Sequence, residues 1–438
     1  MFISESAMTG LTLTQQLTAL INAKPITADT LEQAALLTLD AVANALAGRR
    51  SEPGRILLRW GQHCGKDAGR RAFLQGSLTH ILEVDDLHRA SVVHPGCVVV
   101  PAVWAVAEQM DVPGKIVLEA ILRGFEAATR VGMAVGPAHY RIWHNTATCG
   151  PFGSAMGVAS LLGLDATATV HALGNAGTQS AGFWQFLETG AMTKHLHAGR
   201  AAEAGVLAGE LASLDFTGPP AILEGSRGLF AATCPDADAQ AVIRNPEDPW
   251  QLLQTSLKPW PSCRHTHPAV DAALELSTSL IGEAIEQVEV ETYPAALEVC
   301  DRPNPQSEYE AKFSLQHCVA AALLFGQIDF STFTAQVRDR LAALRTRITL
   351  RVTEPYASAY PQAWGSTVTV VCQNGVRLSA QRTRAKGDPE APLSAQEIIT
   401  KAKRLMEHGG VANGDALVAG ILAMADDGPL PRLVLQLP

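Results

Sequence analysis

The sequence predicts a mainly α-helical protein, with a large all-helical domain joined to a smaller α+β domain. The chain has 438 residues, 47% of them hydrophobic, which is enough apolar surface for two cores. From about residue 10 to 245, apolar residues recur at helical spacing, and only 5% of the residues are aromatic. Strand-like alternation begins only after residue 260. We therefore expect residues 1–260, completed by 393–438, to form the helical domain and 261–392 to form the smaller one.

The helical domain is predicted from five segments. Residues 31–48 carry apolar positions at helical spacing and end at a glycine. The same pattern recurs in 101–110 and 115–135, with proline and glycine at the breaks. Residues 152–164 and 193–214 are rich in glycine, alanine and serine. Small side chains allow helices to approach closely, so we expect these two helices at the centre of the domain.

The smaller domain is predicted from alternating apolar and polar residues. Strands are expected within 287–293, 346–353 and 366–381, and Asn374-Gly375 predicts a hairpin turn inside the last of these. Helices are expected at 267–280, 311–326, 394–405 and 414–425. The last two of these follow the strands, so we expect them to return to the large domain.

The composition excludes several classes of protein. A net charge of −9 argues against a nucleic-acid partner, which requires a basic face. No segment has the roughly 20 apolar residues of a membrane span, and the N-terminus lacks the pattern of a signal peptide, so we expect a cytoplasmic protein. The eight cysteines are scattered singly without a CxxC pair, which predicts reduced thiols instead of a zinc or iron–sulfur site.

The densest polar cluster is HILEVDDLHRASVVHPG, residues 80–96. A continuous helix would place His80, Glu83 and Asp86 on one face, and the Pro95-Gly96 turn would present His94. Carboxylates and imidazoles at a bend are typical of acid–base catalysis or metal binding. A buried network of salt bridges that holds helices together is the alternative.

Two further segments carry candidate polar residues. His144 and Thr146 precede a Gly-Pro break and a small-residue helix, whose first N–H groups would bind a carboxylate. In MTKHLHAGRAAEAG (residues 192–205), Lys194 and His197 share a helical face, with Arg200 a turn further on. A buried lysine suits proton transfer and an arginine binds carboxylates, whereas a solvated basic face is the alternative.

The fourth segment is KPWPSCRHTHPAVDA, residues 258–272. Arg264, His265 and His267 stand at a predicted helix entrance, where anions are favoured. His-X-His would also suit zinc, but a third ligand at a recognisable spacing is missing, so no metal site is predicted. The sequence has no GxGxxG, P-loop or GxSxG motif, so nucleotide-binding and serine-hydrolase functions lack support.

Taken in order, these segments resemble the MmgE/PrpD family of dehydratases, decarboxylases and epimerases. The resemblance rests on DD-X-H…HPG, H-X-T…GPFG, TK-X-LH-X-G-X-AA, RHTH and AKFSL, and covers nearly the whole chain. It implies a large helical domain, a smaller α+β domain and an active site in the cleft between them. It also implies a homodimer that needs no metal or organic cofactor.

The resemblance also implies roles for individual residues. Lys194 and His94 are expected to form the principal acid–base pair, with Asp85 beside them, while His144 and His267 bind or polarise the substrate. The expected substrate-binding residues are Asp86, Thr146, His197, Arg200, Arg264 and His265, the last as a substitute for His267. One position departs from the family pattern, because Leu87 stands where a threonine often follows the two aspartates.

The expected function is therefore that of a lyase, a dehydratase or decarboxylase that transfers protons next to a carboxylate of a small di- or tricarboxylate. The alternative is an isomerase or epimerase of a substituted dicarboxylate such as iminodisuccinate. A third possibility, from another class, is a non-catalytic carboxylate-binding protein. A metallohydrolase built on the histidines ranks below these three.

Overall fold

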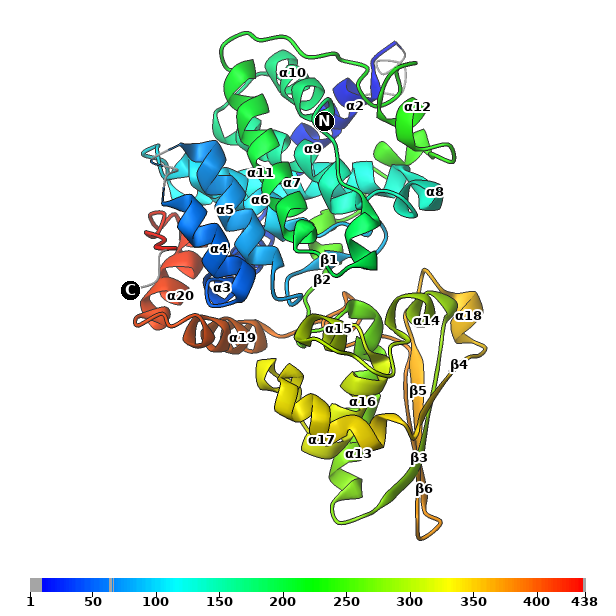
Figure 1. Ribbon diagram of the computed structural model, residues 1–438. Helices are drawn as coiled ribbons and strands as arrows, with labels where there is room; N and C mark the ends of the chain where they lie inside the picture. The colour runs from blue at the N-terminus through cyan, green and yellow to red at the C-terminus, as the bar shows by residue number, and fades with distance from the viewer. Residues whose placement is uncertain (1–9, 63–64, 66, 436–438) are drawn as a thin grey trace. The chain divides into compact units, whose positions relative to one another are not determined.

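A computed structural model describes residues 10–62, 65 and 67–435, and the chain divides into two compact units. Unit 1 comprises Met1–Ser256 and Ser394–Pro438, and unit 2 comprises Leu257–Leu393. The first nine residues, on which the expectation about a signal peptide partly depends, and Cys64 lie outside the described residues. The predicted fold class is confirmed, because unit 1 is built from helices and unit 2 combines helices with a sheet (Figure 1).

Helices account for almost all the regular structure of unit 1. Its α-helices are α2 (Leu13–Ala23), α3 (Ala28–Gly48), α4 (Glu52–Gly61), α5 (Ala68–His80), α6 (Gly96–Ala107), α7 (Gly114–Ala134), α8 (Gly136–Tyr140), α9 (Asn145–Leu161), α10 (Ala166–Gly177), α11 (Thr193–Ala212), α12 (Leu229–Thr233), α19 (Ala395–His408) and α20 (Gly414–Ala423). Two short strands, β1 (Leu87–His88) and β2 (Thr255–Ser256), pair antiparallel.

The small-residue helices lie at the centre of unit 1, as predicted. Helix α9 packs against α6, α7, α10 and α11, and Figure 1 shows α7, α9 and α11 side by side. A Cβ atom on Gly205 would come within 2.1 Å of the Ser154 Cβ, so α11 approaches α9 at a distance that only glycine permits. The predicted break at Gly150-Pro151 is wrong, because α9 begins at Asn145 and continues through Pro151.

The C-terminal segment packs on the first long helix of unit 1. Helix α19 contacts α3, and Lys401 of α19 forms an ion pair with the buried Asp40 at 2.6 Å. The same ammonium group donates a hydrogen bond to the Val84 carbonyl at 2.7 Å. Residues more than 300 positions apart therefore hold the chain just after α5.

Unit 2 contains a four-stranded sheet in the order β4-β3-β5-β6. The strands are β3 (Ile285–Thr292), β4 (Ile348–Val352), β5 (Ser366–Cys372) and β6 (Arg377–Arg382). Strands β3 and β4 are parallel, and the other pairs are antiparallel. The predicted hairpin joins β5 to β6, with Gly375 at φ +83°.

Helices cover one side of this sheet. Helix α13 packs against β5, β6 and α16, and Figure 1 shows α13, α16 and α17 on the same side of the strands. The α-helices of unit 2 are α13 (His267–Ser277), α14 (Pro294–Cys300), α15 (Glu308–Lys312), α16 (Leu315–Phe325), α17 (Ala335–Arg345) and α18 (Tyr356–Ala359). The alternation in β3 places Val288 and Val290 in the core, as the sequence predicts.

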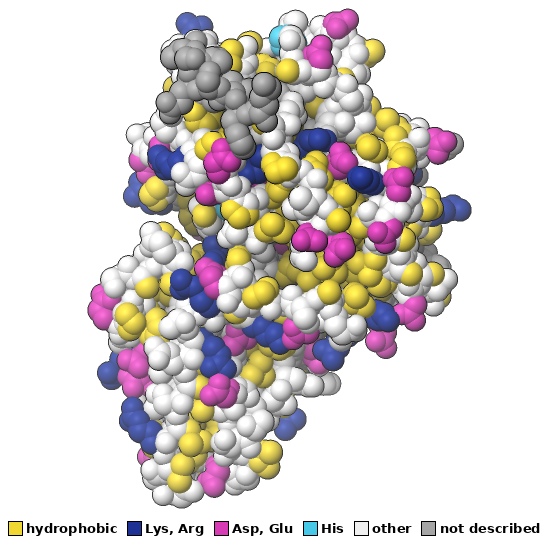
Figure 2. Space-filling view, turned by 180° about the vertical axis from the view of Figure 1, so that it is seen from behind, with side chains coloured by type: hydrophobic (Ala, Val, Ile, Leu, Met, Phe, Trp, Pro, Cys, Tyr) yellow, Lys and Arg dark blue, Asp and Glu magenta, His cyan; other side chains and the backbone are white. Residues whose placement is uncertain are grey.

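The surface agrees with the composition. Acidic and basic side chains are interspersed over the face shown in Figure 2, and neither sign forms a continuous field there. None of the helices in the described ranges is long and apolar enough to cross a membrane.

Candidate active site

The polar cluster at residues 80–96 forms a turning segment between two helices. Helix α5 ends at His80, and the chain then turns through Glu83 at φ +60° and Val92 at φ +51° before α6 begins at Gly96. The prediction that His80, Glu83 and Asp86 share a helical face is therefore wrong. Two residues in left-handed backbone conformations instead let the chain fold back on itself, so that residues close in sequence point in different directions.

Asp86 holds the start of α6. Both of its carboxylate oxygens accept a hydrogen bond from the Gly96 N–H, at 3.1 and 2.9 Å. A Cβ atom at position 96 would lie 2.8 Å from these oxygens, so the contact requires glycine. Asp86 thus holds the backbone at the start of α6, and its contact with substrate stays a prediction.

Two hydrogen bonds orient His94. Its Nδ1 lies 2.5 Å from the Asp86 carbonyl oxygen, which can only accept, so Nδ1 carries a proton. In the neutral imidazole, Nε2 is then the basic nitrogen. The backbone N–H of His94 donates to Thr146 Oγ1 at 3.1 Å, so this hydroxyl supports the histidine, and its contact with substrate stays a prediction.

His80 and Asp85 form a buried pair beside His94. His80 Nδ1 lies 2.6 Å from Asp85 Oδ2, and both residues are at most 1% exposed. The same Asp85 oxygen is 3.6 Å from His94 Nδ1. The His80 ring packs edge-on to His94, with centroids 4.7 Å apart, and stacks on His144 at 5.8 Å. His80 therefore links the turning segment to the N-terminus of α9.

Lys194 forms a buried ion pair with Glu83. Lys194 Nζ lies 2.5 Å from Glu83 Oε1, and the two side chains are 6% and 2% exposed. The lysine belongs to the first turn of α11 and the glutamate to the turn after α5, so tertiary packing alone joins them. Taking two charges from water is unfavourable unless they are paired. The buried lysine of the sequence analysis is therefore confirmed, and the alternative, a solvated basic face, does not hold for Lys194.

His144 and His197 complete the cluster. Their Nδ1 atoms are 3.2 Å apart, so one ring donates and the other accepts. Burial lowers the pKa of His197 to about 4 and the pKa of His144 well below its usual value, and the positive charge of Lys194 lowers both further. The two rings are therefore neutral at pH 7. Trp184 covers His144, with the ring centroids 4.6 Å apart.

Buried neutral histidines predict a loss of stability in mild acid. Burial holds the pKa values of His88, His197, His265 and His317 at about 4 in the folded chain, against 6.5 when exposed. Between pH 6.5 and 4 the unfolded chain therefore binds protons that the folded chain excludes. The free energy of unfolding should therefore have its full value above pH 6.5. It should decrease as the pH is lowered from 6.5, by up to about 1.4 kcal/mol per pH unit for each fully buried imidazole.

Calorimetry at pH 7.0, 6.0 and 5.2 would measure this effect. Burial raises the pKa values of Glu108, Glu210 and Asp271, which opposes the trend, but these carboxyl groups start from 4.5 or 3.8, and the histidines dominate above pH 5. His88→Asn removes one buried imidazole and should make the dependence shallower. Equal melting temperatures at pH 7.0 and 5.2 would contradict the prediction.

In unit 2, His267 and Arg264 are occupied by structural contacts. Arg264 donates to His267 Nδ1 at 2.9 Å and pairs with the buried Asp388 at 2.5 Å. His267 Nε2 then donates to the Ser262 carbonyl at 3.2 Å. Both ring nitrogens of His267 are used in these bonds, and the functional role of His267, or of His265 as its substitute, stays a prediction.

Arg200 lies away from the cluster. Its side chain is 57% exposed and pairs with Glu203. Six residues along a helix advance the direction by about 600°, so Arg200 points roughly 120° away from Lys194. The expectation that it binds a substrate carboxylate therefore has no support in this geometry.

One group in the described part of the chain gathers possible metal ligands, namely His80, Asp85 and Cys97, whose ligand atoms lie within 4.8 Å of one another. His80 and Asp85 already bond each other, and the Cys97 thiol donates to the His94 carbonyl at 3.2 Å. His80, Asp85 and Cys97 therefore form part of the hydrogen-bond network around His94. His265 and His267, for which the sequence predicted no metal site, bond to different partners.

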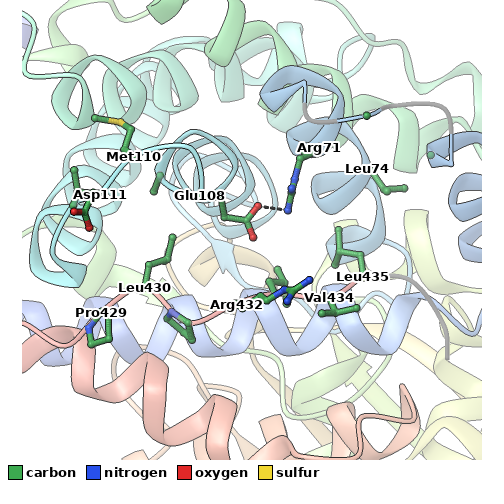
Figure 3. Close-up of a pocket in the computed structure, with 16 residues that line it drawn as sticks. Arg71, Leu74, Glu108, Met110, Asp111, Pro429, Leu430, Arg432, Val434 and Leu435 are labelled. Atoms are coloured by element: carbon green, nitrogen blue, oxygen red, sulfur yellow. Dashed lines mark ion pairs between the residues drawn. The ribbon is translucent and has the colours of Figure 1, made fainter.

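A separate pocket lies between α5, α6 and the segment that follows α20 (Figure 3). Its lining residues include none of the cluster described above. Glu108 pairs there with Arg71 and accepts from the Trp104 indole N–H and the Leu433 backbone N–H. This carboxylate fastens residues 429–435 to the helices, which is a structural role.

Comparison with known proteins identifies the family of this chain. The model of the MmgE/PrpD N-terminal domain matches residues 15–241, and that of the C-terminal domain matches residues 260–418. The chain belongs to the MmgE/PrpD family. The resemblance inferred from the ordered motifs is thereby confirmed.

Several relatives of this MmgE/PrpD protein are named for an activity. Cis-aconitate decarboxylase of Aspergillus terreus is 26% identical over 93% of this chain and 92% of its own length. The enzyme of the same name from Homo sapiens is 26% identical over 75% of this chain and 71% of its own. A cis-aconitate decarboxylase-like protein of Aspergillus oryzae is 30% identical over 51% of each chain.

Proposed function

We propose that this protein is a lyase that acts on a small polycarboxylate by proton transfer next to a carboxylate, without a metal or organic cofactor. The observation that carries the proposal is the buried Lys194–Glu83 ion pair beside the four histidines His80, His94, His144 and His197. Perturbed titratable groups that converge in one buried cluster are typical of catalytic sites. The names of the relatives support decarboxylation as the first activity to test.

The cluster separates a proton donor from a proton acceptor. His94 keeps its Nδ1 proton on the Asp86 carbonyl, so Nε2 is the acceptor. The Lys194 ammonium is a donor only, and Glu83 holds it in place. In a decarboxylation the bond to the departing CO2 breaks, its electron pair remains on the adjacent carbon, and that carbon takes up one proton. Lys194 would stabilise the developing negative charge and supply that proton.

The neutral histidines would orient the substrate. His144 and His197 share one hydrogen bond, and each retains a second ring nitrogen for another contact.

Leu87, where the family often has a threonine, is 3% exposed and lies in β1. A missing hydroxyl removes one hydrogen bond to a substrate. We therefore propose the class of reaction, and experiment must identify the carboxylic acid that is the substrate. We also propose a cytoplasmic homodimer, as the family resemblance implies.

Proton NMR in D2O would test this function. The purified protein, with EDTA present, would be incubated with cis-aconitate, citrate, 2-methylcitrate, tartrate and iminodisuccinate. Loss of a carboxylate with one deuteron incorporated would establish a decarboxylase, a new alkene a dehydratase, and deuterium exchange without a change of skeleton an epimerase. An unchanged spectrum with every acid, together with binding in a thermal-shift assay, would support a binding protein and overturn the proposal.

A further inference from the structure

An aromatic cluster in unit 2 encloses His265. The imidazole stacks on Trp364 with centroids 4.4 Å apart and planes inclined by 7°. Tyr293 lies on another side of the ring, and Tyr360 stacks on Tyr293 at 4.8 Å. Tyr293 is fully buried and Trp364 is 2% exposed, so the walls of this cluster are fixed by packing. His265 itself retains 8% exposure.

A single hydrogen bond fixes the chemistry of the ring. His265 Nδ1 lies 2.8 Å from the Tyr293 hydroxyl oxygen. A buried hydroxyl must place its own hydrogen on an acceptor, and among the described residues Tyr293 Oη contacts no other hydrogen-bond partner. If Nδ1 carried the proton, the tyrosine hydrogen would be left without an acceptor. The tyrosine therefore donates and Nδ1 accepts.

We propose that Tyr293 is a positioning residue that holds His265 as the neutral tautomer with its proton on Nε2, so that His265 donates a hydrogen bond to a substrate carboxylate. The role towards a carboxylate rests on the proposed function, whereas the tautomer rests on the geometry of unit 2 alone. Burial lowers the pKa of His265 to about 4 and raises the pKa of Tyr293 well above its usual value, in keeping with a neutral pair.

This assignment gives His265 a role different from that of His94. The carbonyl of Asp86 makes Nε2 of His94 an acceptor, whereas the hydroxyl of Tyr293 makes Nε2 of His265 a donor. In the described part of the chain, no protein group bonds to Nε2 of His265, so this nitrogen is available to a ligand. A neutral N–H binds a carboxylate without taking up a proton, so His265 would bind the substrate as a hydrogen-bond donor.

Nitrogen NMR tests the tautomer directly and requires no substrate. In protein labelled with 15N-histidine, the His265 signals would be assigned as those missing from His265→Gln. We expect Nε2 to give the shift of a protonated nitrogen and Nδ1 that of an unprotonated one. A protonated Nδ1 would overturn the proposal, whether or not the protein proves to be a lyase.

The role towards substrate is tested with amide replacements. Glutamine places its NH2 group near the position of Nε2, and asparagine places it near that of Nδ1. His265→Gln should therefore retain at least tenfold more kcat/KM than His265→Asn on the active acid of the panel, with most of the difference in KM. Equal values, or a better asparagine variant, would contradict a donor at Nε2. If no acid is turned over, the lyase proposal fails while the NMR result still decides the tautomer.

Two tyrosine variants separate positioning from packing. Tyr293→Phe removes the hydroxyl that bonds to His265 and should lower kcat/KM about tenfold. Tyr360→Phe is the matched control, because Tyr360 belongs to the same stack but makes no hydrogen bond to His265. It should leave the 15N shifts and kcat/KM unchanged. An equal loss of kcat/KM in both variants, with unchanged 15N shifts, would show that Tyr293 contributes only packing.

Discussion

Lys194→Ala is expected to reduce kcat by about 10²–10⁴-fold, because general acid–base catalysis contributes this much. The positive charge of Lys194 acts on His144 and His197 in the histidine cluster of unit 1. An alanine supplies neither a proton nor a positive charge to the carbanion. Initial rates with the acid identified by NMR would measure the loss.

The partner of Lys194 must be considered in the same experiment. Removing the lysine leaves the Glu83 carboxylate buried without its ion pair, and breaking one side of a buried pair costs about 3–5 kcal/mol. Glu83→Gln combined with Lys194→Met removes both charges and should recover most of the melting temperature without recovering activity. A folded double variant with more than about a tenth of the wild-type kcat would remove Lys194 from the mechanism.

Glu126→Ala is expected to lower the free energy of unfolding of unit 1 by about 3–5 kcal/mol. Glu126 of α7 is fully buried and pairs with Arg130 at 2.7 Å and Lys24 at 3.5 Å, and it accepts from the Gln251 N–H at 2.7 Å. The substitution leaves two buried cations without this carboxylate, although backbone carbonyls still accept hydrogen bonds from both, and it leaves the Gln251 N–H without its acceptor. Denaturant unfolding followed by circular dichroism would measure the change.

Glu119→Ala provides a matched control on the same helix. Glu119 pairs with Arg123 at the same i,i+4 spacing, but the two side chains are 21% and 25% exposed. Partly exposed pairs contribute about 1 kcal/mol or less. Comparable losses in the two variants would show that the burial of Glu126 adds nothing beyond the pair itself.

The elements of the fold were largely predictable from local patterns. Small residues in 152–164 and 193–214 predicted the two central helices, and Asn374-Gly375 predicted the hairpin of unit 2. Each of these signals acts over a few residues, since helix periodicity, strand alternation and turn chemistry are local properties. The break predicted at Pro151 failed because packing around α9 outweighs the local preference of proline.

The site was predictable only in part. The ordered motifs identified His94, His144 and Lys194, which do gather in one buried cluster. Glu83 was seen in the sequence but not chosen, and Tyr293 was not considered, because neither belongs to a motif that marks its partner. An acidic residue between Leu82 and Val84 in an otherwise apolar run was the available signal for Glu83.

The sequence alone determined the fold class, the family and the candidate segments of the site, since these depend on periodicity and on the order of short motifs. Only the tertiary structure decided the partners of each side chain. The partner of Lys194 lies 111 positions away in the sequence, and the protonated nitrogen of His94 or His265 is set by one carbonyl or hydroxyl. Hydrogen bonds and desolvation depend on distances of a few ångströms in the folded chain, which sequence spacing does not encode.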